Sequence, residues 1–123
     1  MNWIAVAVGG ALGACLRYAL ALGFTPLDSR FPIATFTANA LGSFLMGLGF
    51  ILIVERAVLG DLWRHFLLIG LLGAFTTFST FSIESLSLLK NELYLMAALY
   101  VLASVVMSLL FASMGIAIAK YFI

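Results

Sequence analysis

Four long apolar runs alternate with short polar connections along this chain. The runs cover residues 3–24, 31–54, 66–89 and 94–119. Each is long enough for a membrane-spanning helix, which needs about 20 mostly apolar residues. Together they use most of the 123 residues, so little length remains for a soluble domain. The pattern predicts an all-α integral membrane protein with a single four-span domain, residues 1–123.

The composition supports this interpretation and narrows the function. Hydrophobic residues make up 65% of the chain and charged residues 9%, whereas a typical soluble domain is about half apolar. The sequence contains no metal-ligand spacing, no nucleophile–base pair and no phosphate-binding loop. It also has no basic patch for nucleic acid. We therefore expect a membrane protein that is neither an enzyme nor a nucleic-acid binder.

The basic residues give the chain little preference for one orientation. With four spans, the N-terminus, the second connection and the C-terminus share one side. That side carries Arg56, Arg64 and Lys120, and the opposite side carries Arg30 and Lys90. Because the Lys/Arg bias sets membrane orientation, this near balance predicts a chain that inserts both ways, unless the sides are assigned wrongly. Dual insertion allows an antiparallel homodimer, and four short helices are too few to enclose a pathway alone.

A glycine pair and an arginine share one face of the first run. Gly9, Gly13 and Arg17 recur every four residues. The glycines form a GxxxG pair that permits close helix packing. A charge within a span is costly and usually faces a cavity or a partner, although Arg17 could instead extend to the membrane interface. Both positions for Arg17 remain open.

Amide and hydroxyl groups interrupt the second and fourth runs. The Asn39 amide has two N–H donors that can replace water around an anion, or it can bond to a neighbouring helix. Tyr100, Ser104 and Ser108 repeat every four residues in the fourth run. They form either a row of donors for a transported ion or a set of interhelical hydrogen bonds.

The third run contains the most unusual segment, GLLGAFTTFSTFS at residues 70–82. Gly73 weakens the helix just before Thr76 and Thr77. A break there would free backbone carbonyls near the midplane, and such carbonyls bind cations in membrane proteins. The alternative is a continuous helix whose threonine hydroxyls bond to carbonyls one turn earlier. Irregular backbone at this depth is tolerated only inside protein or beside a wet cavity.

Two phenylalanines follow the threonine pair. Phe78 and Phe81 are three residues apart and share a helix face, while Ser79 and Thr80 point elsewhere. Phenylalanine in a span normally contacts lipid or core. The alternative role uses the positive edge of the ring, which can face a small anion without binding it too tightly for conduction.

Three segments resemble the Fluc (CrcB) family of fluoride channels. They are GGALGACLRY at 9–18, ATFTANALGSFLMG at 34–47 and GLLGAFTTFSTFSIE at 70–84. The resemblance covers essentially the whole chain, and TTFSTFS is its most specific part. Ala34 and Ala74 stand where many members have glycine, and we expect neither difference to impair function.

This resemblance implies a fluoride-selective channel that exports fluoride passively and so reduces its toxicity. It implies an antiparallel, dual-topology homodimer in the cell (inner or plasma) membrane, with a broken third helix and with fluoride and lipid as partners. A structural Na⁺ at the dimer centre would be held by the main-chain carbonyls of Gly73 and Thr76. The implied fluoride pathway comprises Asn39, Phe78, Phe81, Ser79, Thr80, Tyr100, Ser104, Ser108 and Arg17.

A small multidrug-type, proton-coupled exporter is the main alternative, since it is also a four-span antiparallel dimer. Such an exporter needs a carboxylate within the membrane, but the first span here has Arg17, which would repel cationic drugs. A non-transporting assembly subunit would need neither Asn39 nor the paired rings. Glu84 matches an acidic position of the Fluc family. From the sequence it is a partner for Lys90 or lies at a solvated helix end, and its role stays open.

Overall fold

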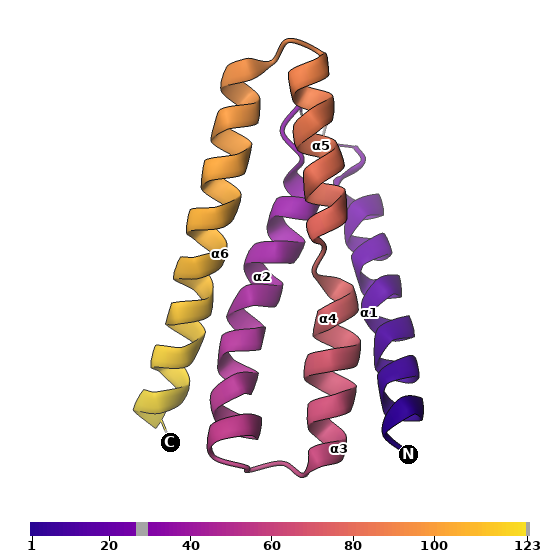
Figure 1. The fold of residues 1–123 in the computed structure, drawn as a ribbon, viewed down its shortest axis with the longest axis vertical. Coiled ribbons are helices and arrows are strands. Elements are labelled where there is room, and N and C mark those ends of the chain that lie inside the picture. The colour runs from indigo at the N-terminus through magenta and orange to yellow at the C-terminus, as the bar shows by residue number, and fades with distance from the viewer. Residues whose placement is uncertain (27–29, 123) are drawn as a thin grey trace.

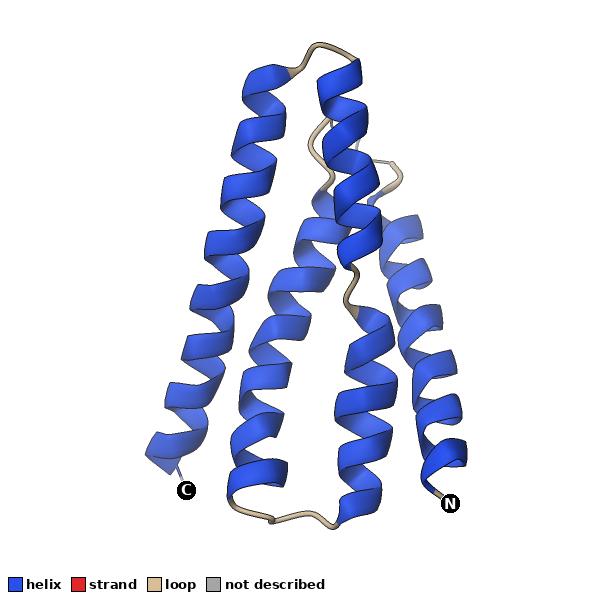
Figure 2. Cartoon of the chain, viewed as in Figure 1, coloured by secondary structure: helices blue, strands red, loops and turns tan. Residues whose placement is uncertain are grey.

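The computed structural model describes residues 1–26 and 30–122, and within these ranges all regular structure is helical (Figure 2). Four segments are long and apolar enough to cross a membrane: Asn2–Phe24, Ile33–Glu55, Asp61–Lys90 and Tyr94–Phe122. The prediction of an all-α membrane protein with four spans is confirmed. The first span is α1 (Asn2–Phe24), and the last is α6 (Tyr94–Phe122).

The two middle spans are composite. The second consists of α2 (Ile33–Gly49) and a π-helical segment, η1 (Phe50–Glu55). The third consists of α3 (Asp61–Trp63), π-helical η2 (Arg64–Leu72), α4 (Gly73–Phe75) and α5 (Phe78–Lys90).

The third span begins at Asp61, five residues before the predicted boundary at residue 66. The predicted start was wrong because the apolar run begins only after the first polar turn of the helix. An acidic residue is favourable in that turn because it faces the positive end of the helix dipole. Asp61 also accepts a hydrogen bond from Asn2 Nδ2 at 3.4 Å, which connects the starts of α1 and α3.

Both termini and the connection between η1 and α3 lie at the same end of the molecule (Figure 1). The most extensive helix pairs are α1 with η2 and α2 with α6. Thus α1 supports the first half of the third span, whereas α6 packs along α2.

Glycine allows backbone contact in both pairs. A Cβ atom at Gly9 would overlap the carbonyl oxygen of Phe66, and one at Gly13 would overlap that of Leu71. The predicted close packing through the GxxxG pair is therefore confirmed, with η2 as the partner. In the other pair, a Cβ at Gly47 would overlap the carbonyl oxygen of Ala112.

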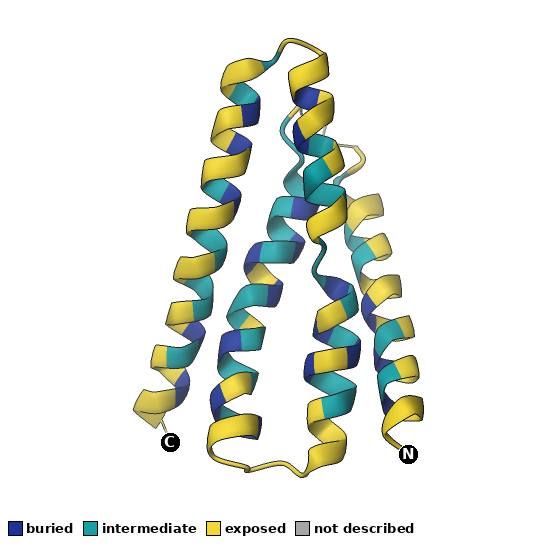
Figure 3. Cartoon of the chain, in the orientation of Figure 1, coloured by how far each residue is buried: buried dark blue, intermediate teal, exposed yellow. Residues whose placement is uncertain are grey.

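Buried residues face the inside of the helix bundle, while much of the outer surface is apolar and exposed (Figure 3). Leu102 and Leu109 of α6 are 64% and 65% exposed. An exposed apolar surface of this kind suits a lipid environment, where the driving force for helix association comes from packing and polar contacts.

Candidate functional site

Two residues with extended backbone separate α4 from α5. Thr76 has φ −79° and ψ 155°, and Thr77 has φ −151° and ψ 118°. Figure 2 shows this short loop midway along the third span. Backbone groups at such a depth must find partners within the protein, so the neighbouring side chains determine whether the arrangement is stable.

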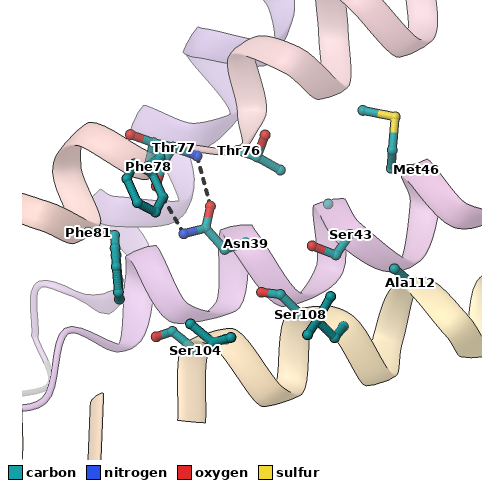
Figure 4. A pocket seen from close by; sticks show the side chains of 13 residues that line it. Asn39, Ser43, Met46, Thr76, Thr77, Phe78, Phe81, Ser104, Ser108 and Ala112 are labelled. Carbon is teal, nitrogen blue, oxygen red and sulfur yellow. Dashed lines mark hydrogen bonds between the residues drawn. The ribbon is translucent and has the colours of Figure 1, made fainter. Parts of the chain in front are cut away.

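Asn39 of α2 provides partners for both backbone groups of Thr77. The Thr77 N–H donates to Asn39 Oδ1 at 2.8 Å, and Asn39 Nδ2 donates to the Thr77 carbonyl oxygen at 3.0 Å (Figure 4). The amide thus pairs with Thr77 as an adjacent β-strand would. One of its two N–H groups is used in this contact, which leaves the other for a ligand.

Two further hydrogen bonds hold the ends of this segment, one within α5 and one from α1. The Thr80 N–H donates to Thr77 Oγ1 at 3.2 Å, so Thr77 caps the start of α5. Arg17 Nε donates to the carbonyl oxygen of Ala74 at 3.2 Å. This contact places the half-buried Arg17 side chain against the end of α4.

The same contacts leave two carbonyls without their usual helical donors. In an α-helix, the carbonyl of Gly73 would accept from the N–H of Thr77, and that of Thr76 from the N–H of Thr80. Those two N–H groups instead bond to Asn39 and to the Thr77 hydroxyl. Gly73 is also exposed on the surface of the single chain. Both carbonyls therefore fit the role of oxygen ligands for a hard cation.

A cavity of about 430 Å³ lies between α2, α5 and α6, next to Thr77 (Figure 4). None of the described residues that line it is charged. Ser43 and Met46 are among its lining residues. Five of the nine predicted pathway residues also line it: Asn39, Phe78, Phe81, Ser104 and Ser108.

The two rings form one wall of this cavity. The centroids of Phe78 and Phe81 are 5.5 Å apart, and Phe81 also packs against Tyr100 at 5.3 Å. Phe78 is 78% exposed although it lines the cavity. The single chain therefore leaves the cavity open on the side of Phe78.

Ser104 provides an unused polar group. Its Oγ is buried and has no hydrogen-bond partner among the described residues. Buried hydroxyl groups are nearly always satisfied, so this one fits the role of a donor to a ligand in the cavity. Ser108 follows one turn later on the same wall.

Tyr100 does not line this cavity. Its side chain is fully buried, and its hydroxyl donates to Glu84 Oε2 at 2.6 Å. The Thr35 hydroxyl donates to Glu84 Oε1 at 2.8 Å. The structure thus gives Glu84 two hydroxyl donors in place of Lys90 or a solvated helix end, so those expectations for Glu84 are wrong. The spacing places Thr35 one turn before Asn39 on the same face of the second span, but it does not predict the contact between Thr35 and Glu84.

A second cavity, of about 280 Å³, lies on the other side of Thr77. Arg17, Thr80, Thr35 and Glu84 contribute to its lining, and Thr77 lines both cavities. Ser79 is exposed and lines neither cavity. Seven of the nine predicted pathway residues therefore line one of two cavities that share Thr77, while Tyr100 and Ser79 line neither.

These features define a multi-pass integral membrane protein with two cavities beside an extended segment in its third span. Comparison with known families identifies it further. Residues 4–116 match the family described as "CrcB-like protein, Camphor Resistance (CrcB)". The chain belongs to this family.

Several relatives share most of their length with this chain, and each is named "Fluoride-specific ion channel FluC". The protein from Saccharophagus degradans is 55% identical over 107 residues, which cover 87% of this chain and 80% of the relative. The one from Alteromonas mediterranea is 47% identical over 120 residues, which cover 94% of this chain and 91% of the relative. The one from Magnetococcus marinus is 42% identical and covers 94% of both chains.

Proposed function

We propose that this protein is a fluoride-specific channel that lets fluoride leave the cytoplasm down its electrochemical gradient. The observation that carries the proposal is the cavity where the Asn39 amide, the unpartnered Ser104 hydroxyl and two phenylalanine rings converge. The names of the relatives support the same function.

The chemistry of the cavity suits a small, strongly hydrated anion. Removing water from an ion in an apolar environment is very costly unless other groups replace it. Amide and hydroxyl donors can do this, and aromatic ring edges add a weak positive potential. Among the residues that the structure describes, no lysine or arginine lines the cavity, so an entering anion meets no fixed charge from them that would hold it. Passage requires such moderate binding.

Passive export follows from the acid–base chemistry of fluoride. Hydrogen fluoride enters from an acidic medium as a neutral molecule and loses its proton in the more alkaline cytoplasm. A membrane potential that is negative inside then drives the anion outward through any selective channel. The proton-coupled alternative is not favoured, because the carboxylate of Glu84 is bound by two hydroxyls and lies outside the cavity with the rings.

Fluoride release from liposomes tests this function. Purified protein should release fluoride, read with an ion-selective electrode, without releasing chloride and without a proton gradient. The Phe81→Ile variant keeps an apolar side chain but removes the ring, and we expect it to conduct at least tenfold less. Equal leakage of chloride, or release that depends on a proton gradient, would contradict the channel assignment.

We further propose that two copies assemble as an antiparallel, dual-topology dimer. The open side of the cavity at Phe78 requires a cover, and the near balance of basic residues permits both orientations. An Asn91→Cys variant in a Cys15→Ser background tests orientation, since Asn91 is exposed in the connection before α6. A membrane-impermeant thiol reagent added to intact cells should label about half of the chains. Complete or absent labelling would show a single orientation.

The dimer centre is the proposed site of a structural Na⁺. The carbonyls of Gly73 and Thr76 would hold the ion, which would supply a positive charge between the two third spans. Exchange of sodium for a large organic cation during purification should lower the dimer fraction measured by cross-linking. A dimer fraction that is the same in both salts would argue against the cation site.

A further inference from the structure

The first half of the third span ends in a set of carbonyl groups that its own helix cannot satisfy. Any helix leaves its last four carbonyls without intrahelical donors. Here the carbonyl oxygen of Leu72 still accepts from Thr76, through the N–H at 3.1 Å and the hydroxyl at 3.0 Å. The carbonyl of Ala74 would be served by the N–H of Phe78 in a continuous helix, but Phe78 begins a separate helix. Ala74 therefore depends on another element.

Arg17 is that partner, and its position is fixed by backbone contacts. Its Nε donates to the Ala74 carbonyl oxygen at 3.2 Å. Gly9 and Gly13 lie on the same face of α1 and touch the η2 backbone directly. The helix therefore holds Arg17 at a set height along the third span. A cation at the C-terminal end of a helix is favoured by the helix dipole, and a charge-assisted hydrogen bond adds to this.

We infer that Arg17 is a positioning residue that fixes the end of α4 through the Ala74 carbonyl, and so keeps Thr77 in register with Asn39. Thr77 lies three residues beyond Ala74, and its two hydrogen bonds with Asn39 require a set backbone position. This role differs from attracting anions by charge. It depends on a donor at the Nε position, and it relies on the proposed fluoride function only for one of its two readouts.

Two substitutions separate the donor from the charge. In glutamine, the amide nitrogen follows Cδ, as Nε does in arginine, so Arg17→Gln keeps a donor at this position and removes the charge. In lysine, the nitrogen is one bond further out, so Arg17→Lys keeps the charge and moves the donor. Arg17→Met removes both. Positioning predicts that glutamine replaces arginine better than lysine does, whereas anion attraction predicts the reverse order.

Hydrogen exchange of the dimer, followed on peptides covering residues 73–82, gives a readout that does not depend on conduction. We expect exchange about tenfold faster in Arg17→Met than in the wild type, since a hydrogen bond to a charged group shifts a local equilibrium by about this factor. The exchange rate of Arg17→Gln should stay within about threefold of the wild-type rate, and the rate of Arg17→Lys should be closer to that of Arg17→Met. Peptides from α6 report whether each variant is folded.

Fluoride release from liposomes provides the second readout, with Arg64→Gln as a control that removes an exposed arginine. Fluoride release should decrease in the order wild type, Arg17→Gln, Arg17→Lys, Arg17→Met. The Arg64→Gln control should release fluoride as fast as the wild type. Any other order in hydrogen exchange, above all lysine ahead of glutamine, overturns the inference. If Arg17→Met does not fold, the order of the Arg17→Gln and Arg17→Lys exchange rates decides whether Arg17 acts by positioning. A wild type without fluoride release would refute the proposed function, while the exchange order would still decide the role of Arg17.

Discussion

Replacement of Asn39 by aspartate should reduce fluoride release by about a hundredfold or more. The new carboxylate can still accept the N–H of Thr77, but its second oxygen replaces the N–H that now donates to the Thr77 carbonyl at 3.0 Å. Two acceptors would then face each other. The cavity would also gain a negative charge, and a like charge about 4 Å from an anion costs about 4 kcal/mol at an effective dielectric constant near 20.

Electrode measurements of fluoride release from liposomes test this prediction, and two further variants serve as controls. Asn91→Asp makes the same change at an exposed asparagine outside the cavity and should leave release unchanged. Asn39→Ala removes the Thr77 contacts without adding charge, so its loss should be smaller than that of aspartate. Release by Asn39→Asp within about twofold of the wild type would place this amide outside the ion pathway.

Gly13→Ala should have the largest effect on stability. A Cβ atom there would overlap the carbonyl oxygen of Leu71. The obstacle is rigid backbone, so α1 must move away from η2. Overpacking of this kind typically costs about 1–3 kcal/mol, and separation of α1 from the third span would also withdraw Arg17 from Ala74. We expect a lower Tm of the purified dimer and reduced fluoride release.

Two other glycines of α1 provide matched controls for this variant. A Cβ atom at Gly10 or Gly23 would meet no atom within 4 Å. Gly10→Ala and Gly23→Ala make the same chemical change on the same helix and should keep the Tm of the wild type. If Gly13→Ala were as stable as these controls, the backbone contact between α1 and η2 would not contribute to the fold.

The sequence predicted the features that depend on local pattern. Apolar runs of sufficient length identified all four spans, and the four-residue spacing placed Gly9, Gly13 and Arg17 on the face that meets the third span. The start at Asp61 was missed because a polar first turn carries no apolar signal. Hydropathy therefore locates spans well and their polar ends poorly.

Contacts between distant residues were beyond prediction from one sequence. Asn39 and Thr77 are 38 residues apart, and only the packed structure shows that they pair. The stripe of Tyr100, Ser104 and Ser108 shows a different limit. Residues four apart advance about 40° around a helix with 3.6 residues per turn, so the first and last members differ by about 80°. This rotation explains why Tyr100 turns to Glu84 while Ser104 and Ser108 line the cavity.

Thr77 is the only described residue shared by the two cavities beside the third span. If water entered the two cavities from opposite faces of the membrane, the Thr77 segment would be the thinnest part of the insulating layer between them. The transmembrane voltage then falls mainly across this point, where moving one charge through 100 mV corresponds to about 2.3 kcal/mol. In that case the transmembrane field would be steepest at this one threonine.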